Sequence, residues 1–120
     1  MPQRTTISTH VLDTASGQPA AGVAVSLLRI AAGAETLVGD AVTDDDGRIG
    51  DLLVVRGAPA ELTAGTYRLS FAVGAYRRAR GEGDAFFERV SLDVTLSDTT
   101  RSYHVPLLLA PFGCTSYRGS

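Results

Sequence analysis

Residues 6–12 read Thr6-Ile7-Ser8-Thr9-His10-Val11-Leu12, and two kinds of side chain alternate along them. The odd-numbered positions are all β-branched, while the even-numbered positions from 8 onward carry Ser8, His10 and Leu12. Alternation with a period of two is typical of a β-strand that has one face in the protein interior and the other outside. The stretch therefore predicts a strand that presents His10 on its outer face.

The same period recurs along the chain and predicts an all-β fold. Further strands are expected over residues 23–30, 35–43, 49–55, 66–73, 86–96 and 101–109. Gly33 and the pair Asp46-Gly47 mark tight turns between them. Only residues 75–80 favour a short helix. Short strands separated by frequent turns predict an antiparallel β-sandwich, in a single domain over residues 1–120.

Composition limits the classes of partner. The chain has 120 residues and a formal net charge of -2, so neither nucleic acid nor an anionic membrane is favoured. All 11 basic residues are arginine, which excludes Schiff-base chemistry on a lysine. The longest apolar runs, such as residues 105–110, are too short to span a membrane, and residues 1–6 lack the apolar run of a secretory signal. We therefore expect a cytoplasmic protein.

The two histidines, His10 and His104, both fall in predicted strands. By the period of two, His104 shares an outer face with Ser102 and Pro106. Each histidine is either an ordinary surface residue or, if the two strands are neighbours, half of a proton-transfer site. The spacing does not place the strands side by side, so both interpretations stay open. Two histidines without a carboxylate at ligand spacing, and a single cysteine, favour no metal site and no cofactor.

An acidic turn at residues 43–48 precedes a lone arginine. The spacing fails as a calcium loop, because Val42 and Leu53 occupy two of the ligand places. A charged hairpin turn with Asp46-Gly47 at its tip explains the acids but not Arg48. An arginine in that place would suit an anionic or oxygen-rich substrate, because its planar fork donates paired hydrogen bonds.

The C-terminal residues 111–120 have two interpretations. The first is a last strand with a frayed end, since chain termini are commonly loose. In that interpretation Cys114 is a small strand residue, and Ser116 and Ser120 lack the strand-to-helix elbow of a nucleophilic serine. The second interpretation comes from the resemblance that follows.

Taken together, these segments resemble the transthyretin-like family, in its branch that hydrolyses 5-hydroxyisourate in urate degradation. The similarity covers nearly the whole chain, and its most specific parts are the opening histidine motif and the Tyr-Arg-Gly-Ser ending. The matching segments, in the order of the family, are residues 8–14, 17–20, 43–48, 65–71, 86–87, 104–109 and 117–120.

The resemblance implies a sandwich of two four-stranded sheets with one short helix. It makes the first and seventh strands neighbours, which would bring His10 and His104 together on an outer sheet face. It also implies a homotetramer, a dimer of dimers, with those faces lining the channel between dimers. In that family Pro106 would fall inside a paired strand, where proline removes a hydrogen-bond donor, so we expect a bulge or an unpaired position there.

The resemblance also implies a metal-free reaction. His10, Arg48 and His104 would line the pocket, Tyr117 would hold the substrate, and Ser120 or its carboxylate would complete the site. The expected reaction converts 5-hydroxyisourate to 2-oxo-4-hydroxy-4-carboxy-5-ureidoimidazoline. A histidine would activate water and Arg48 would stabilise charge on the attacked carbonyl oxygen. His10 is the expected base and His104 the acid or orienter, or the reverse.

Two other functions compete with hydrolysis. Transthyretin itself carries thyroid hormone in a channel lined by apolar and lysine side chains, so a small-ligand carrier without catalysis is the alternative. This chain has no lysine and keeps both histidines, which favours the hydrolase. A non-catalytic β-sandwich accessory module is the third interpretation.

Overall fold

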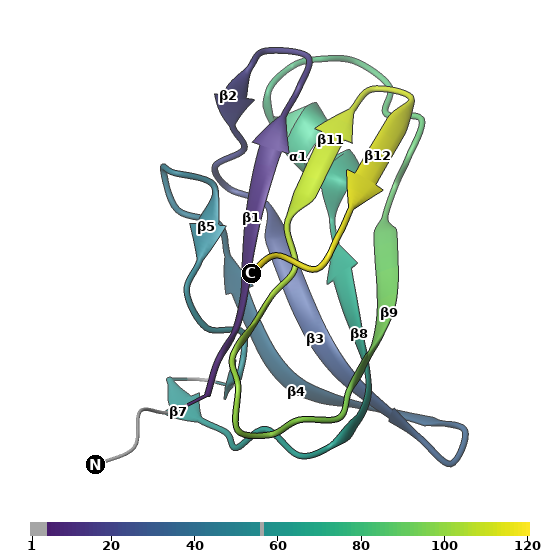
Figure 1. The fold of residues 1–120 in the computed structure, drawn as a ribbon. Helices are drawn as coiled ribbons and strands as arrows, with labels where there is room; N and C mark the ends of the chain where they lie inside the picture. The colour runs from purple at the N-terminus through teal and green to yellow at the C-terminus, as the bar shows by residue number, and fades with distance from the viewer. Residues whose placement is uncertain (1–4, 56) are drawn as a thin grey trace.

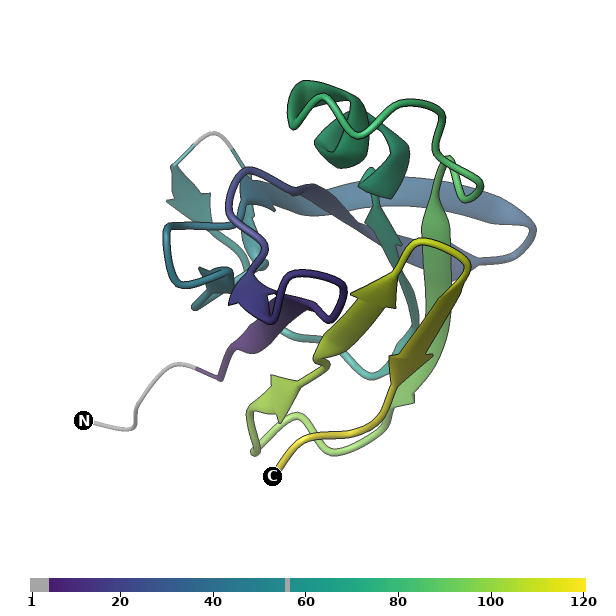
Figure 2. The same ribbon diagram turned by 90° about the horizontal axis from the view of Figure 1, so that it is seen from above.

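Two β-sheets pack face to face to form the molecule (Figures 1 and 2). The computed structural model describes residues 5–55 and 57–120; residues 1–4 of the opening segment and Arg56 lie outside the described residues. The buried apolar side chains come from both sheets and form one cluster between them. The all-β sandwich expected from the period of two is confirmed.

One sheet is antiparallel throughout and has the strand order β4-β3-β8-β9. The turn between β3 and β4 consists of Ala32 and Gly33, which both have positive φ (52° and 75°). Positive φ at both central residues is what a two-residue type I′ hairpin requires, which confirms the turn expected at Gly33. The four strands are β3 (Ala24–Ala31), β4 (Ala34–Val42), β8 (Gly65–Phe71) and β9 (Val90–Leu96).

The other sheet is built around β1. On one side β1 runs parallel to β10 and β11, and β12 lies antiparallel beyond β11. On the other side β1 pairs antiparallel with the short strands β2 and β5. Because β10 continues into β11, and β2 and β5 share one edge, this sheet is also four strands wide. Its members are β1 (Ile7–Asp13), β2 (Gln18–Pro19), β5 (Arg48–Ile49), β10 (Tyr103–His104), β11 (Leu107–Ala110) and β12 (Gly113–Ser116).

Pro106 accounts for the break between β10 and β11. The proline lies at an unpaired position between the two strands, as expected from its missing N–H. The register with β1 does not shift across the break: Ser8 faces His104 before it, and Val11 faces Leu107 after it. The strand therefore continues past the proline without a bulge, and the faces of its side chains are preserved.

Alternating burial along β1 confirms its two faces. The odd-numbered residues from Ile7 to Asp13 are all buried, and the even-numbered ones between them, including His10, are half-buried. Each large apolar side chain buried in this way contributes about 1.5–3 kcal/mol. The largest fully buried apolar side chains are Tyr67, Phe71, Ile7, Leu27, Leu52, Leu53, Leu69, Leu107 and Leu109.

Helix α1 (Val73–Ala79) lies near the end of the sandwich where β1 ends (Figure 1). It begins two residues before the expected position, because Val73 and Tyr76 lie on one helical face and are both buried. No helix in residues 5–55 and 57–120 is long and apolar enough to cross a membrane.

Several expected strands differ from those observed. The strand expected over residues 66–73 ends at Phe71, because Val73 begins α1, and the one expected over residues 101–109 begins at Tyr103. Residues 49–55 do not form one strand: β5 stays beside β1, and the chain then leaves the sheet for a separate hairpin of β6 (Val54–Val55) and β7 (Ala58–Pro59). The Asp51 side chain accepts a hydrogen bond from Leu53 N (2.9 Å), a local turn that interrupts the strand. Residues 86–89 do not join β9, which begins at Val90.

Candidate active site

His10 and His104 lie on the same outer sheet face. Ser8, two residues before His10, is opposite His104 in the parallel pairing of β1 with β10. Because side chains alternate, Ser8 and His10 share one face of β1, and both are half-buried. His104 is half-buried as well, next to the buried Tyr103. The two histidines are thus brought together by neighbouring strands, as the resemblance implied.

Arg48 joins them from the other side of β1. It is exposed, and in the antiparallel pairing of β1 with β5 it lies opposite His10. The central strand therefore carries one histidine between a second histidine on β10 and an arginine on β5.

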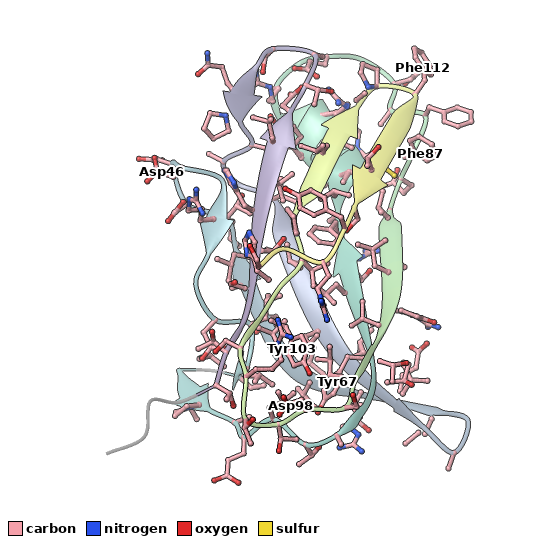
Figure 3. All side chains as sticks on the ribbon, in the orientation of Figure 1. Asp46, Tyr67, Phe87, Asp98, Tyr103 and Phe112 are labelled. Atoms are coloured by element: carbon pink, nitrogen blue, oxygen red, sulfur yellow. The ribbon has the colours of Figure 1, made fainter. Side chains whose placement is uncertain are left out.

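A fixed turn places Arg48. The Asp44 carboxylate accepts hydrogen bonds from Asp46 N and Arg48 N, each at 2.9 Å. Gly47 has φ 73°, and a Cβ there would collide with the carbonyl oxygen of Val11. The acids are therefore turn residues, as expected, with Asp46 at the outer tip (Figure 3). The turn does not close a hairpin within one sheet, however, because β4 and β5 belong to different sheets.

The guanidinium of Arg48 is free of carboxylates, unlike those of Arg68, Arg77, Arg78 and Arg80, which all form ion pairs. Within the described residues no carboxylate or other hydrogen-bond acceptor engages the side chain of Arg48. A guanidinium left in this state beside two imidazoles is available to an anionic or polarised oxygen of a ligand.

The C-terminal segment returns to the histidine face instead of fraying. After β12 the chain turns back, and Gly119 N donates a hydrogen bond to the His104 carbonyl oxygen (2.8 Å). In Figure 1 the C-terminus lies over β1, and in the view from above in Figure 2 it lies outside the sheet that contains β1. Gly119 is buried, whereas Tyr117 and Ser120 are exposed on either side of it. The segment thus forms one wall of the site.

His104 is the most constrained of these groups. Its Nδ1 lies 2.8 Å from Ser8 Oγ. Burial lowers the pKa of His104 below its ordinary value of 6.5, and the positive charge of Arg48 and the proximity of His10 lower it further. A neutral imidazole near pH 7 can accept a proton, so the electrostatics of the face favour base chemistry at His104.

The sequence interpretation gave Ser8 and Gly119 no role of their own, although both fall in the segments that match the family. Ser8 shares the outer face with His10, and this parity was visible in the sequence. Nothing in the pattern indicated that its partner would be His104, because the register of two strands far apart in the chain is not encoded in either alone.

The described part of the chain contains no group of three His, Cys, Asp or Glu side chains arranged to hold a metal ion. Cys114, in β12, is exposed. What the arrangement offers chemically is two imidazoles for proton transfer, one unpaired guanidinium, and a C-terminal wall.

Comparisons with known proteins agree with this geometry. Residues 7–119 match the HIUase/Transthyretin family. The chain is similar to the 5-hydroxyisourate hydrolase of Deinococcus radiodurans, at 44% identity over 116 residues that cover 95% of each chain.

Two solved structures have the same fold. The structure of Klebsiella pneumoniae 5-hydroxyisourate hydrolase is 38% identical, covers 97% of this chain and 99% of its own, and gives a TM-score of 0.79. Sea bream transthyretin in complex with thyroxine is 29% identical, covers 95% of this chain and 94% of its own, and gives a TM-score of 0.82.

Proposed function

Because the chain belongs to the HIUase/Transthyretin family, we propose that it is a hydrolase that converts 5-hydroxyisourate to 2-oxo-4-hydroxy-4-carboxy-5-ureidoimidazoline in urate degradation. The observation that carries the proposal is the convergence of His10, His104 and the unpaired Arg48 on one sheet face. The reaction consumes one water and uses no metal or cofactor.

The proposed mechanism divides the chemistry among these groups. One histidine takes a proton from water, which is a poor nucleophile until it is deprotonated. The hydroxide forms a bond to the ring amide carbon, and Arg48 stabilises the negative charge that develops on the carbonyl oxygen. The carbon–nitrogen bond then breaks, and the nitrogen leaves with a proton supplied by an imidazolium. Tyr117 holds the substrate, and Ser120 or its carboxylate closes the pocket.

We further propose that the domain, residues 1–120, works as a cytoplasmic homotetramer, a dimer of dimers with the sites at the dimer–dimer channel. The edge strands β9 and β12 each have one side unpaired among the described residues. They support self-association, since exposed edges are ready templates for pairing with another chain. A groove of about 520 Å³ runs between β9 and the C-terminal segment.

An exposed aromatic cluster lies at the end of the molecule where β11 turns back into β12. Phe86 and Phe112 are 68% and 81% exposed, and their ring centroids are 6.0 Å apart. The ring of Phe86 also contacts that of Phe87, with centroids 4.9 Å apart, and Figure 3 labels Phe87 and Phe112 at the same end of the molecule. Large exposed aromatic side chains are typical of protein–protein contacts.

A direct assay tests the activity. 5-Hydroxyisourate is generated from urate in situ, and its loss is followed by ultraviolet absorbance with and without the protein. We expect the loss to be faster with protein; decay at the spontaneous rate would refute the hydrolase. Light scattering of the same sample tests the tetramer separately, because a monomer mass would refute the assembly and leave the activity standing.

A small-ligand carrier is the second candidate, favoured by the likeness to the thyroxine-bound transthyretin structure. The unpaired Arg48 beside two histidines argues for the hydrolase, because a carrier needs no proton-transfer pair. Tight binding of an apolar ligand by a protein that fails the absorbance assay would favour the carrier.

A further inference from the structure

Ser8 makes a contact that the proposed mechanism does not use. Its Oγ lies 2.8 Å from His104 Nδ1, within the distance of a good hydrogen bond. It also lies 3.4 Å from the carbonyl oxygen of Tyr103. One hydroxyl thus faces both the imidazole and the main chain of β10.

The main chain holds this contact in place. Tyr103 N donates to Thr6 O and Val105 N donates to Ser8 O, both at 2.9 Å, so the backbone is fixed on each side of His104. On the far side of the imidazole, a Cβ on Gly119 would come within 2.6 Å of His104 Cδ2, so the backbone of Gly119 lies directly against the ring. The ring is therefore held between Ser8 and the C-terminal segment.

The two neighbours of the hydroxyl limit where its proton can go. A carbonyl oxygen can only accept a hydrogen bond, whereas a neutral imidazole nitrogen either donates or accepts. When the Ser8 hydroxyl donates to Tyr103 O, its lone pair remains for Nδ1–H of His104. The proton of the neutral ring then resides on Nδ1, and Nε2 carries the free lone pair.

We propose that Ser8 is a positioning residue that holds His104 as its Nδ1–H tautomer, so that Nε2 is the atom that takes the proton from the attacking water. The inference rests on the proposed hydrolase function. Water gives one proton to Nε2, and its oxygen bonds to the amide carbon. When the carbon–nitrogen bond breaks, an imidazolium returns one proton to the leaving nitrogen, so one water is consumed.

This assigns different tasks to the two histidines. The ring of His10 has no hydrogen-bond partner within residues 5–55 and 57–120, so nothing comparable fixes its tautomer. His10 is free to adjust to the substrate and to assist departure of the nitrogen. Of the two assignments that the resemblance leaves open, the proposal therefore takes the one with His104 as base.

The charged and titratable groups that face His104 support its assignment as the base. Arg48 on β5 is a cation and His10 on β1 is a second imidazole, and both disfavour a proton on His104. The substrate therefore meets His104 in its neutral form near pH 7, which is the form that a base requires.

The tautomer can be measured without any turnover. Nitrogen-15 NMR of the imidazoles distinguishes a protonated from an unprotonated ring nitrogen, and the chain has only 2 histidines. Comparison with His10→Gln assigns the signals of His104. We expect a protonated Nδ1 and an unprotonated Nε2 in the neutral wild-type ring. A protonated Nε2 would overturn the proposal even if the protein proves to be an active hydrolase.

Kinetics give the second readout. Ser8→Ala should lower kcat by roughly 10- to 100-fold with little change in KM, because a misplaced catalytic group costs about that much. Ser8→Thr, which keeps the hydroxyl, should restore most of kcat. An unchanged kcat in Ser8→Ala would overturn the proposal.

Ser102→Ala is the matched control. Ser102 Oγ accepts a hydrogen bond from Thr6 N (2.9 Å) across the same two chain segments, and within the described residues it forms no hydrogen bond with His104. If Ser8 acted only by holding the strands together, both alanine variants would lose activity in proportion to stability. We expect only Ser8→Ala to change kcat and the His104 tautomer; equal kinetic losses in the two variants would contradict the positioning role.

Discussion

The backbone of Gly119 lies so close to the imidazole of His104 that a Cβ on the glycine would come within 2.6 Å of Cδ2 and 3.2 Å of Cγ. Contacts under 3 Å are not tolerated between carbon atoms, so any side chain at this position must displace either the ring or the C-terminal segment. The Tyr-Arg-Gly-Ser ending is thus coupled to the histidine through its glycine.

Gly119→Ala should therefore lower kcat by roughly 10- to 100-fold while leaving the fold intact, because the added methyl group shifts the His104 ring from its place. The rate and the melting temperature are measured together. Gly113→Ala is the control, since a Cβ at Gly113 meets no atom within 4 Å. Equal activity in the two variants would show that the packing of Gly119 on His104 does not matter for the reaction.

Much of the fold could be predicted from side-chain alternation. The faces of β1 followed from the β-branched residues at its odd positions, and the irregularity at Pro106 followed from the missing N–H. What alternation cannot supply is the sheet to which a strand belongs. Residues 49–55 are rich in apolar and β-branched side chains, yet β5 pairs with β1 while β6 pairs with β7, because the Asp51 turn diverts the chain.

The same limit applies to the site. Period-two counting placed His10 and His104 on outer faces, but their proximity depends on the parallel register of β1 with β10, whose residues are far apart in the chain. The resemblance to the family supplied the prediction that these two strands are neighbours. Neither the alternation nor the resemblance predicted a role for Ser8, because that role depends on a single cross-strand hydrogen bond to His104.

Arg48→Ala should reduce kcat by roughly 100- to 1,000-fold, the usual cost of removing one donor to a developing oxyanion. The fold should be unaffected, because Arg48 is exposed and no described carboxylate depends on it. Arg48→Lys should recover only part of the rate, since an ammonium group cannot donate the paired hydrogen bonds of a guanidinium. Steady-state kinetics on the three proteins measure this.

Arg78→Ala is the matched control for the loss of positive charge, because Arg78 is exposed and pairs with Glu88 on a different part of the surface. Its kcat should stay near that of the wild type. A loss as large as that of Arg48→Ala would mean that overall charge, and not the position of Arg48, determines the rate.

Asp13 anchors the end of β1 to α1 and should be important for stability. Its buried carboxylate accepts hydrogen bonds from Ala15 N (3.0 Å) and Tyr76 Oη (3.0 Å), and it lies 3.7 Å from Arg77 Nη1. Burial and the hydrogen bond to Asp13 raise the pKa of Tyr76 to about 12. The phenol therefore stays protonated at physiological pH and keeps donating its hydrogen bond to the Asp13 carboxylate.

Asp13→Ala should lower the free energy of unfolding by about 3–5 kcal/mol, because it leaves the buried Arg77 with one carboxylate partner fewer. Tyr76→Phe should cost less, about 1–3 kcal/mol, since it removes one hydrogen bond and keeps the aromatic ring. Denaturant unfolding measures both. A larger loss in Tyr76→Phe than in Asp13→Ala would contradict this account of the network.

The lowered pKa of His104 predicts two effects of acid. As a base, His104 should remain neutral below its ordinary pKa of 6.5, so the acid limb of kcat/KM should have its midpoint below that value. In the unfolded chain His104 takes up its proton near pH 6.5. Between the two pKa values the unfolded state therefore binds more protons than the folded state, and the free energy of unfolding must fall as the pH decreases. The contribution is fully present above pH 6.5 and is lost as the pH falls towards the folded pKa.

Arg48→Ala tests the electrostatic part of that shift. Removing the cation should raise the folded pKa of His104 towards its ordinary value, without reaching it, because burial is the larger cause. Nitrogen-15 NMR titration of His104 in Arg48→Ala and in the Arg78→Ala control measures the midpoint directly. We expect the midpoint to rise in the first variant and to stay unchanged in the second. An unchanged midpoint in Arg48→Ala would mean that the guanidinium does not face the imidazole in solution, and its proposed role beside His104 would have to be abandoned.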